Sequence, residues 1–387
     1  MHASTKKKRL LIIGAYGCGN RGDDAILHSI AAAFSDCDIC ATCGSYENIG
    51  KTVAVETTPL RLNEGFSAGV LFSMLADCSR LLRRLLSSDA LMFGGGSLIH
   101  DLTPYNLPFM FLWHRLARLL GKPVFYMCMG VGPLNTEKGR KSCGKMLPLA
   151  EGLFVRDQRG LRLCRQCGAN NAVLVRDAAF ADRIDAGDAA VLTGLCLKRA
   201  EYICVTGSQW FSSQNFWRRG ELDFSAEMDR FANCVRELHN RYRMKLVFVP
   251  TVFHDAQLGK ELALRLEDIE FSVAPAELDC TEMERLIANA YLLLGVRMHS
   301  IIFAAKHAVP FVALVYDEKV RELLSALELE RYCVDISDDY TDKVKALLPL
   351  VDQSREDIRE ALRAKSEDFA AAAGLCFSET RRTCAWE

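Results

Sequence analysis

The chain has 387 residues, more than one hydrophobic core usually serves, so two domains of ordinary size are expected. Hydrophobic residues make up 50% and charged residues 25% of it, close to globular averages, which excludes a disordered or fibrous protein. The 48 Lys and Arg residues balance 49 Asp and Glu residues, so the chain lacks the broad basic field of a nucleic-acid-binding protein. We expect no nucleic-acid partner.

The first residues carry no apolar region like that of a secretory signal, because the basic run from Lys6 to Arg9 leads directly into a predicted strand. No stretch reaches the roughly 18 apolar residues that a membrane-spanning helix needs. We therefore expect a cytoplasmic protein.

Residues 71–86 form an amphipathic pattern with Arg80, Arg83 and Arg84 on the polar side. An ordinary surface helix with its leucines on the core is one interpretation. The other is a weak peripheral contact with the inner face of the cell membrane.

Short apolar runs alternate with helical patterns along the whole chain, which is typical of parallel sheets covered by helices. The predicted strands lie at 9–14, 38–43, 90–94, 124–130, 153–157, 172–175, 202–207, 245–250, 291–296, 311–316 and 331–336. The predicted fold is α/β, with two Rossmann-like lobes and mostly parallel sheets.

A polar, glycine-containing stretch at 182–200 separates the two sets of strands. We predict an N-terminal lobe at 1–190, a C-terminal lobe at 191–350 and a helical tail at 351–387. Two-lobed α/β proteins bind ligands at the carboxyl ends of their strands, so the ligand is expected in a cleft between the lobes.

The first strand leads into a glycine-rich turn that opens a helix. Gly17 and Gly22 let the backbone approach a ligand, and the helix start offers free N–H groups to an anion. Residues 17–22 match a dinucleotide fingerprint formally, but no acidic residue ends the next strand, so nicotinamide binding is not indicated. A tight turn explains the glycines and leaves Asn20 and Asp23 unexplained.

A second glycine turn follows the strand at 90–94. It contains Gly94, Gly95, Gly96 and Ser97. Successive glycines after a strand indicate close approach of another group to the backbone. His100 and Asp101 come next, and either is a candidate base toward a sugar hydroxyl, with a helix cap and a loop hydrogen bond as the structural alternative.

Cationic residues follow two late strands. Arg297 and His299 lie where the strand at 291–296 ends and a helix begins, and Lys319 follows the strand at 311–316. Parallel strands end at one edge of a sheet, so these three side chains should converge where helix N-termini already favour an anion.

Arg156 ends a strand of the first lobe, with Asp157 as its expected partner, and can hold a phosphate or carboxylate across the cleft. Arg176 and Asp177 repeat the pair after the next strand, and we interpret them as mainly structural.

Cysteine is frequent, with 16 residues scattered along the chain. Two clusters have spacings that occur in zinc and iron–sulfur sites. They are Cys37, Cys40 and Cys43, in a predicted strand, and Cys164 and Cys167, in a predicted helix. We assign both to packing and expect no metal.

These motifs together resemble the polysaccharide pyruvyl transferase family, in unbroken order from about residue 9 to 330. The matching segments are Asn20–Asp23, Gly94–Ser97, Gly130–Pro133, Arg156–Asp157, Arg297–His299 and Tyr316–Lys319. Gly160 departs from the pattern, because the family often has Ser there.

The resemblance implies a fold like that of the GT-B glycosyltransferases, with phosphoenolpyruvate as donor and no cofactor. The acceptor would be a sugar of a cell-surface polysaccharide or of its lipid-linked precursor, bound on the N-terminal side and converted to a pyruvate ketal. The resemblance assigns Arg156, His299 and Lys319 to the donor, with Arg297 beside them. His299 is the candidate acid for the methylene carbon or the departing phosphate.

Two other functions compete. A GT-B glycosyltransferase with a nucleotide-sugar donor would need an acidic residue for the ribose, and Glu282 and Glu284 are the candidates in the second half. A non-catalytic anion-binding scaffold would lose the cationic set, which this chain retains.

Overall fold

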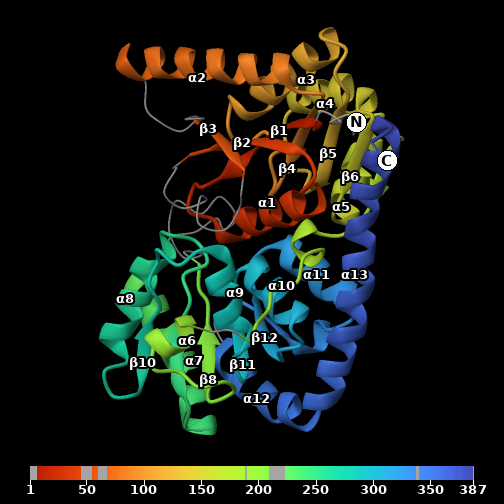
Figure 1. Ribbon diagram of the computed structural model, residues 1–387. Coiled ribbons are helices and arrows are strands. Elements are labelled where there is room, and N and C mark those ends of the chain that lie inside the picture. The colour runs from red at the N-terminus through yellow and green to blue at the C-terminus, as the bar shows by residue number, and fades with distance from the viewer. Residues whose placement is uncertain are drawn as a thin grey trace, which may run out of the picture. The chain divides into compact units, whose positions relative to one another are not determined.

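The computed structural model describes residues 7–44, 55–59, 68–187, 190–208, 223–336 and 340–386, with backbone only for 68–74. They belong to two compact α/β units, Met1–Asp182 with Phe369–Glu387 and Arg183–Asp368 (Figure 1). The division after Asp182 falls at the start of the polar stretch at 182–200, ahead of the predicted bound at 190. The tail at 351–387 is divided between the units.

The first unit contains a sheet of seven parallel strands in the order β3-β2-β1-β4-β5-β6-β7. Their bounds are β1 Arg9–Tyr16, β2 Asp38–Cys43, β3 Glu56–Pro59, β4 Ala90–Gly94, β5 Val124–Met129, β6 Gly152–Val155 and β7 Ala172–Leu174. The strand order reverses between β1 and β4, and a ligand of an open α/β sheet binds outside the carboxyl ends at such a point. Both glycine-rich turns follow these two strands.

Helices cover both faces of this sheet (Figure 1). Their bounds are α1 Arg21–Ala33, α2 Ala68–Ser87, α3 Asn106–Leu119, α4 Glu137–Met146 and α5 Gln158–Gln166, with short 3₁₀ turns at Leu147–Leu149 and Ala178–Phe180. Because both faces are covered, every residue of β4 and β5 is buried, and such strands read as continuous apolar runs.

The C-terminal helix α13, Arg355–Cys384, belongs partly to each unit. Within the first unit, Phe377 packs edge-on against Phe34, and the Cys376 sulfur lies 3.3 Å from that of Cys128 on β5. Arg381 forms an ion pair with Asp36. The last residues of the chain thus complete the core that the first residues begin.

The second unit contains six parallel strands in the order β10-β9-β8-β11-β12-β13. Their bounds are β8 Tyr202–Val205, β9 Lys245–Phe248, β10 Phe271–Val273, β11 Leu292–Gly295, β12 Phe311–Val315 and β13 Cys333–Asp335. The helices are α6 Ala190–Gly194, α7 Phe224–Tyr242, α8 Asp255–Arg265, α9 Cys280–Ala288, α10 Met298–Lys306, α11 Glu318–Leu327 and α12 Tyr340–Gln353, with a 3₁₀ turn at Glu330–Tyr332.

The predicted fold class is confirmed. A strand overlaps each of the eleven predicted runs, and β3 and β10 are additional. Among the described residues, no three His, Cys, Asp or Glu side chains gather as metal ligands would. No helix of the described part is both long and apolar enough to cross a membrane.

Candidate functional site

The first glycine turn is built around the start of α1. The Asn20 side chain accepts a hydrogen bond from the Gly22 N–H at 3.1 Å and so caps the helix. Its amide nitrogen donates to Asp23 Oδ2 at 2.8 Å. The N–H of Gly17 donates to Asp24 Oδ1, also at 2.8 Å. These contacts account for Asn20 and Asp23, which the turn alone did not explain.

The two glycine turns lie directly against each other. Gly96 has φ +60°, and a Cβ there would stand 2.7 Å from Asp23 Oδ1. The Tyr16 hydroxyl donates to the Gly94 carbonyl oxygen at 2.6 Å. Gly95, at φ +87°, also uses left-handed backbone that favours glycine. The successive glycines therefore serve the close approach that the sequence predicted.

A hollow of about 370 Å³ opens at this edge of the first sheet. Both turns contribute to its lining through Asp23 and Ser97, and His100 lines it as well. Sequence reasoning missed two aromatic lining residues, Tyr105 and Phe109, because site residues were sought directly after strands and these two lie at and within the start of α3. Aromatic faces beside polar groups suit a ligand with both apolar and hydroxyl surfaces.

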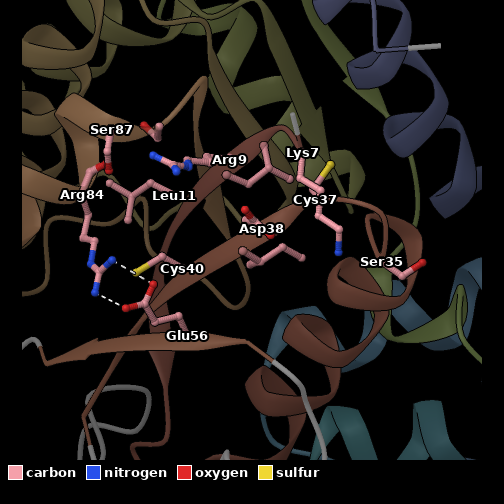
Figure 2. Close-up of a pocket in the computed structure, with 13 residues that line it drawn as sticks. Lys7, Arg9, Leu11, Ser35, Cys37, Asp38, Cys40, Glu56, Arg84 and Ser87 are labelled. Atoms are coloured by element: carbon pink, nitrogen blue, oxygen red, sulfur yellow. Dashed lines mark hydrogen bonds and ion pairs between the residues drawn. The ribbon is translucent and has the colours of Figure 1, made fainter. Parts of the chain in front are cut away.

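A second hollow, of about 550 Å³, lies at the opposite edge of the sheet, around the first residues of β1 and β2 (Figure 2). Lys7 and Arg9 line it, and Arg84 reaches across to an ion pair with Glu56. It is the larger of the two, but open α/β sheets bind ligands at the carboxyl ends of their strands. We therefore place the candidate site at the first hollow.

Arg156 follows β6 and is 8% exposed. Its guanidinium contacts Asp177 Oδ2 at 2.8 Å and donates to the Ser97 hydroxyl at 3.1 Å, which ties it to a residue that lines the hollow. Burial lowers the pKa of Arg156, but the Asp177 and Asp157 carboxylates outweigh burial and raise it. A Cβ on Gly130 would lie 2.9 Å from this guanidinium, so the turn at Gly130–Pro133 leaves the room that Arg156 occupies.

Arg156 has a second partner besides the expected one. Asp157 Oδ2 is 3.8 Å from the guanidinium, within ion-pair distance, and its other oxygen caps α5 by accepting from the Gly160 N–H at 2.6 Å. Asp177, which was predicted to pair with Arg176, makes the shorter contact with Arg156.

His100 and Asp101 have different surroundings. The ring nitrogens of His100 lie 3.3 Å from the Leu102 N–H and 3.0 Å from the Asn106 amide, and burial lowers the pKa of His100. Asp101 accepts hydrogen bonds from Asn135 and Thr136, and these lower its pKa although burial opposes them. Asp101 therefore holds the loop before α4. The role of either residue as a base stays a prediction.

In the second unit, Arg297 occupies the N-cap position of α10 after β11, and its side chain forms a bidentate ion pair with Asp255, at 2.9 and 2.7 Å. Asp255, in the first turn of α8, is 1% exposed. Burial raises the pKa of Asp255 and Arg297 opposes that rise. The Tyr316 hydroxyl also hydrogen-bonds to Arg297. Sequence reasoning missed Asp255, although it follows β9 at the edge where the other candidates were sought.

His299 lies in the first turn of α10 and is 9% exposed. Lys319 lies in the first turn of α11, with its ammonium 3.2 Å from Asp317 Oδ2. Since β11 and β12 are neighbouring parallel strands, Arg297, His299 and Lys319 follow one edge of the second sheet. Arg156 belongs to the first unit, and its convergence with them in a cleft stays a prediction.

A sequence model of the family described as polysaccharide pyruvyl transferase matches residues 20–318. The chain belongs to this family. The matched region contains the candidate site residues named in the sequence analysis except Gly17, which precedes it, and Lys319, which immediately follows it. A relative in Erwinia amylovora, the amylovoran biosynthesis protein AmsJ, is 24% identical over 371 residues, covering 85% of this chain and 88% of AmsJ. The polysaccharide pyruvyl transferase family is a family of transferases, so the chain is a transferase connected with polysaccharides.

Solved structures with the same fold include MnaA from S. aureus with UDP, at TM-score 0.65, 14% identity and 98% coverage of both chains. Anabaena HepE with UDP and glucose has TM-score 0.62 at 13% identity, covering 98% of this chain and all of HepE. The UDP-GlcNAc 2-epimerase of Neisseria meningitidis has TM-score 0.64 at 10% identity, with 97% and 100% covered. These likenesses confirm the predicted fold class, a GT-B-like fold whose two units each contain a parallel α/β sheet.

Proposed function

We propose that this pyruvyl transferase family member uses phosphoenolpyruvate as its donor and forms a cyclic ketal on a sugar of a cell-surface polysaccharide or of its lipid-linked precursor. One sugar hydroxyl adds to the enol carbon and loses its proton, while the methylene carbon takes up a proton and becomes a methyl group. A second hydroxyl then displaces inorganic phosphate from the same carbon. Two C–O bonds form, one C–O bond breaks, and no cofactor is consumed.

The observation that carries this proposal is the cationic edge of the second sheet. Arg297 occupies the N-cap position of α10, His299 lies in the first turn of that helix, and Lys319 lies in the first turn of α11. Two helix N-termini and three side chains that can bear positive charge would therefore attract the same anion. Phosphoenolpyruvate carries a phosphate and a carboxylate on a three-carbon frame, so its recognition requires several such donors close together. His299 would move the proton to the methylene carbon or to phosphate.

The hollow of the first unit suits a sugar acceptor. Tyr105 is 41% exposed and offers an aromatic face, and Asn106 and Asp23 provide polar groups for hydroxyls. Burial lowers the pKa of His100, which favours the neutral imidazole that a general base requires. Asp101 is the weaker candidate for a base, since its carboxylate already accepts three hydrogen bonds.

The nucleotide-sugar alternative receives less support. Glu282 accepts from the Asp279 N–H in the capping box of α9, and Glu284 is buried against Lys306 and His307. Both acidic candidates for a ribose partner are therefore engaged inside the fold. The likeness to structures that hold UDP concerns the fold, which many functions share.

The decisive experiment measures phosphate release from phosphoenolpyruvate by the full-length protein, with a panel of acceptor glycans and a parallel panel of nucleotide-sugars. Phosphate release that depends on a glycan, with a pyruvate ketal detected on the product by mass spectrometry, is the expected result. Glycosyl transfer from a nucleotide-sugar without any turnover of phosphoenolpyruvate would contradict the proposal.

The role of His299 is tested by His299→Gln, with turnover and donor affinity measured separately. If His299 moves a proton, turnover should fall about a hundredfold or more while donor affinity changes much less. His307→Gln, at the far end of the same helix, is the matched control and should keep turnover. Near-normal turnover and affinity in His299→Gln would remove this residue from the site.

A further inference from the structure

The outer face of α2 exposes leucines although the opposite face of the helix already packs on the core. Leu81 and Leu85 are fully buried, whereas Leu75, Leu82 and Leu86 are 62%, 38% and 53% exposed. Leu75, Leu82 and Leu86 are spaced by seven and four residues, so they share one side of the helix. An ordinary surface helix places polar residues on that side.

Helix α3 repeats this arrangement. Met110 and Trp113 are buried, while Leu112 and Leu119 are 51% and 76% exposed, and Leu120, which ends the helix, is 39% exposed.

The two helices lie on the same side of the first sheet (Figure 1). Leu81 and Leu85 share one buried cluster with Met110 and Trp113, so the outer faces of both helices point away from the same sheet surface. The Lys122 ammonium, just after α3, donates to the Ser88 carbonyl oxygen, just after α2, at 2.5 Å. We call the surface formed by the exposed leucines of α2 and α3 the leucine face.

The charged residues of these helices are mostly positive. The sequences of α2 and α3 contain five arginines and one acidic residue, Asp77, which is 2% exposed. Arg80 pairs with Asp77, Arg84 with Glu56 and Arg118 with Glu151.

Arg83 and Arg115 form no ion pair with any residue that the structure describes. Arg83 approaches the Ser79 carbonyl and Arg115 lies 5.7 Å from the centre of the Phe111 ring. The sequence predicted Arg80, Arg83 and Arg84 on the polar side of this helix. Arg80 and Arg84 are ion-paired, whereas Arg83 and Arg115 lie beside the exposed leucines.

We propose that the leucine face binds the surface of an anionic lipid bilayer. Leucines reach the boundary between headgroups and acyl chains, and arginines stay at headgroup level opposite the negative lipids. A second copy of this chain is a poorer occupant, because a two-fold interface would bring the arginines of this face near their own copies. Protein bound in this way would meet an acceptor with a lipid anchor at the membrane, but its binding does not depend on the reaction it catalyses.

The test is co-sedimentation of the full-length protein with vesicles of phosphatidylcholine alone or with 30% phosphatidylglycerol, a composition chosen here to give about −30 to −50 mV of surface potential. We expect binding to the anionic vesicles that weakens with salt. Arg83→Gln with Arg115→Gln should lower the partition constant about twenty-five-fold, because each arginine near an anionic surface contributes about fivefold. Leu86→Gln with Leu119→Gln should lower it at least about tenfold.

Leu264→Gln with Leu375→Gln is the matched control, since these leucines are 66% and 57% exposed on α8 and α13. This control should bind vesicles like the wild type, and circular dichroism should report the same fold for all variants. Absence of vesicle binding by the wild type, or equal loss in the control, overturns the proposal. Self-association in light scattering that only the α2 and α3 leucine variant abolishes would assign the face to a second copy instead.

Discussion

The bidentate pair between Arg297 and Asp255 makes an asymmetric prediction about stability. Arg297→Met keeps the volume of the side chain but leaves a carboxylate that is 1% exposed without its partner. Asp255→Asn instead leaves a guanidinium whose side chain is 26% exposed and can turn to water. Removing one partner of a buried ion pair costs about 3–5 kcal/mol. We expect that cost for Arg297→Met, and about 1–2 kcal/mol for Asp255→Asn, which loses one charged hydrogen-bonding partner.

The penalty in Arg297→Met should depend on pH. Burial raises the pKa of Asp255, and loss of the opposing guanidinium raises it further. A carboxyl whose pKa is higher in the folded than in the unfolded protein contributes to the free energy of unfolding while it is protonated. The protein loses that contribution as pH rises through the folded-state pKa. The deficit of Arg297→Met relative to wild type should therefore be largest at pH 8 and shrink toward pH 4.5.

The assay is urea denaturation followed by circular dichroism at both pH values, with hydrogen exchange of α8 and α10 to locate the loss in the second unit. The double variant, which combines Arg297→Met with Asp255→Asn, should be no less stable than Arg297→Met alone, because it contains no unpaired carboxylate. A larger loss in Asp255→Asn than in Arg297→Met, or a deficit that does not change with pH, would refute this account of the pair.

Three other changes have expected outcomes. Gly96→Ala should lower the melting temperature more than Gly121→Ala. Both glycines have positive φ (+60° and +68°), but only a Cβ at Gly96 meets another group, Asp23. Equal shifts in melting temperature would show that the contact with Asp23 has no effect on stability. Asp101→Ala should cost about 1–3 kcal/mol in urea denaturation by leaving Asn135 and Thr136 donors unpaired, and an unchanged midpoint would contradict this. Treatment with EDTA should change neither melting temperature nor phosphate release. Stoichiometric zinc or iron in the purified protein would contradict the assignment of the clustered cysteines to packing.

The sequence predicts most of the fold because strands buried on both faces are continuous apolar runs. β4 and β5 read in this way and were predicted with nearly correct bounds. β3 has the sequence ETTP and lies at the edge of its sheet, and β10 has only three half-buried residues, also at an edge. Neither forms an apolar run that stands out from its surroundings, in contrast to β7 and β13, which are also edge strands but were predicted.

Candidate site residues could be located by strand ends, because the carboxyl edge of a parallel sheet is fixed by topology. Their partners could not. Nothing local in the sequence connects Arg156 with Asp177 rather than with its neighbour Asp157, or Arg297 with Asp255, which is 42 residues away. Such pairs depend on the lengths of side chains and the positions of helices in three dimensions.

The two-part membership of α13 constrains the order in which the protein can fold during synthesis. The first unit contains the N-terminus, and domains at that end generally fold first. Here its core is finished by residues from Phe369 onward, such as Cys376, whose buried sulfur contacts that of Cys128 across 248 positions. The ribosome must therefore deliver the entire second unit before the first can close. Until then the apolar surface around Phe34 and Cys128 remains exposed to solvent. A chaperone that shields apolar surface could bind there until synthesis ends.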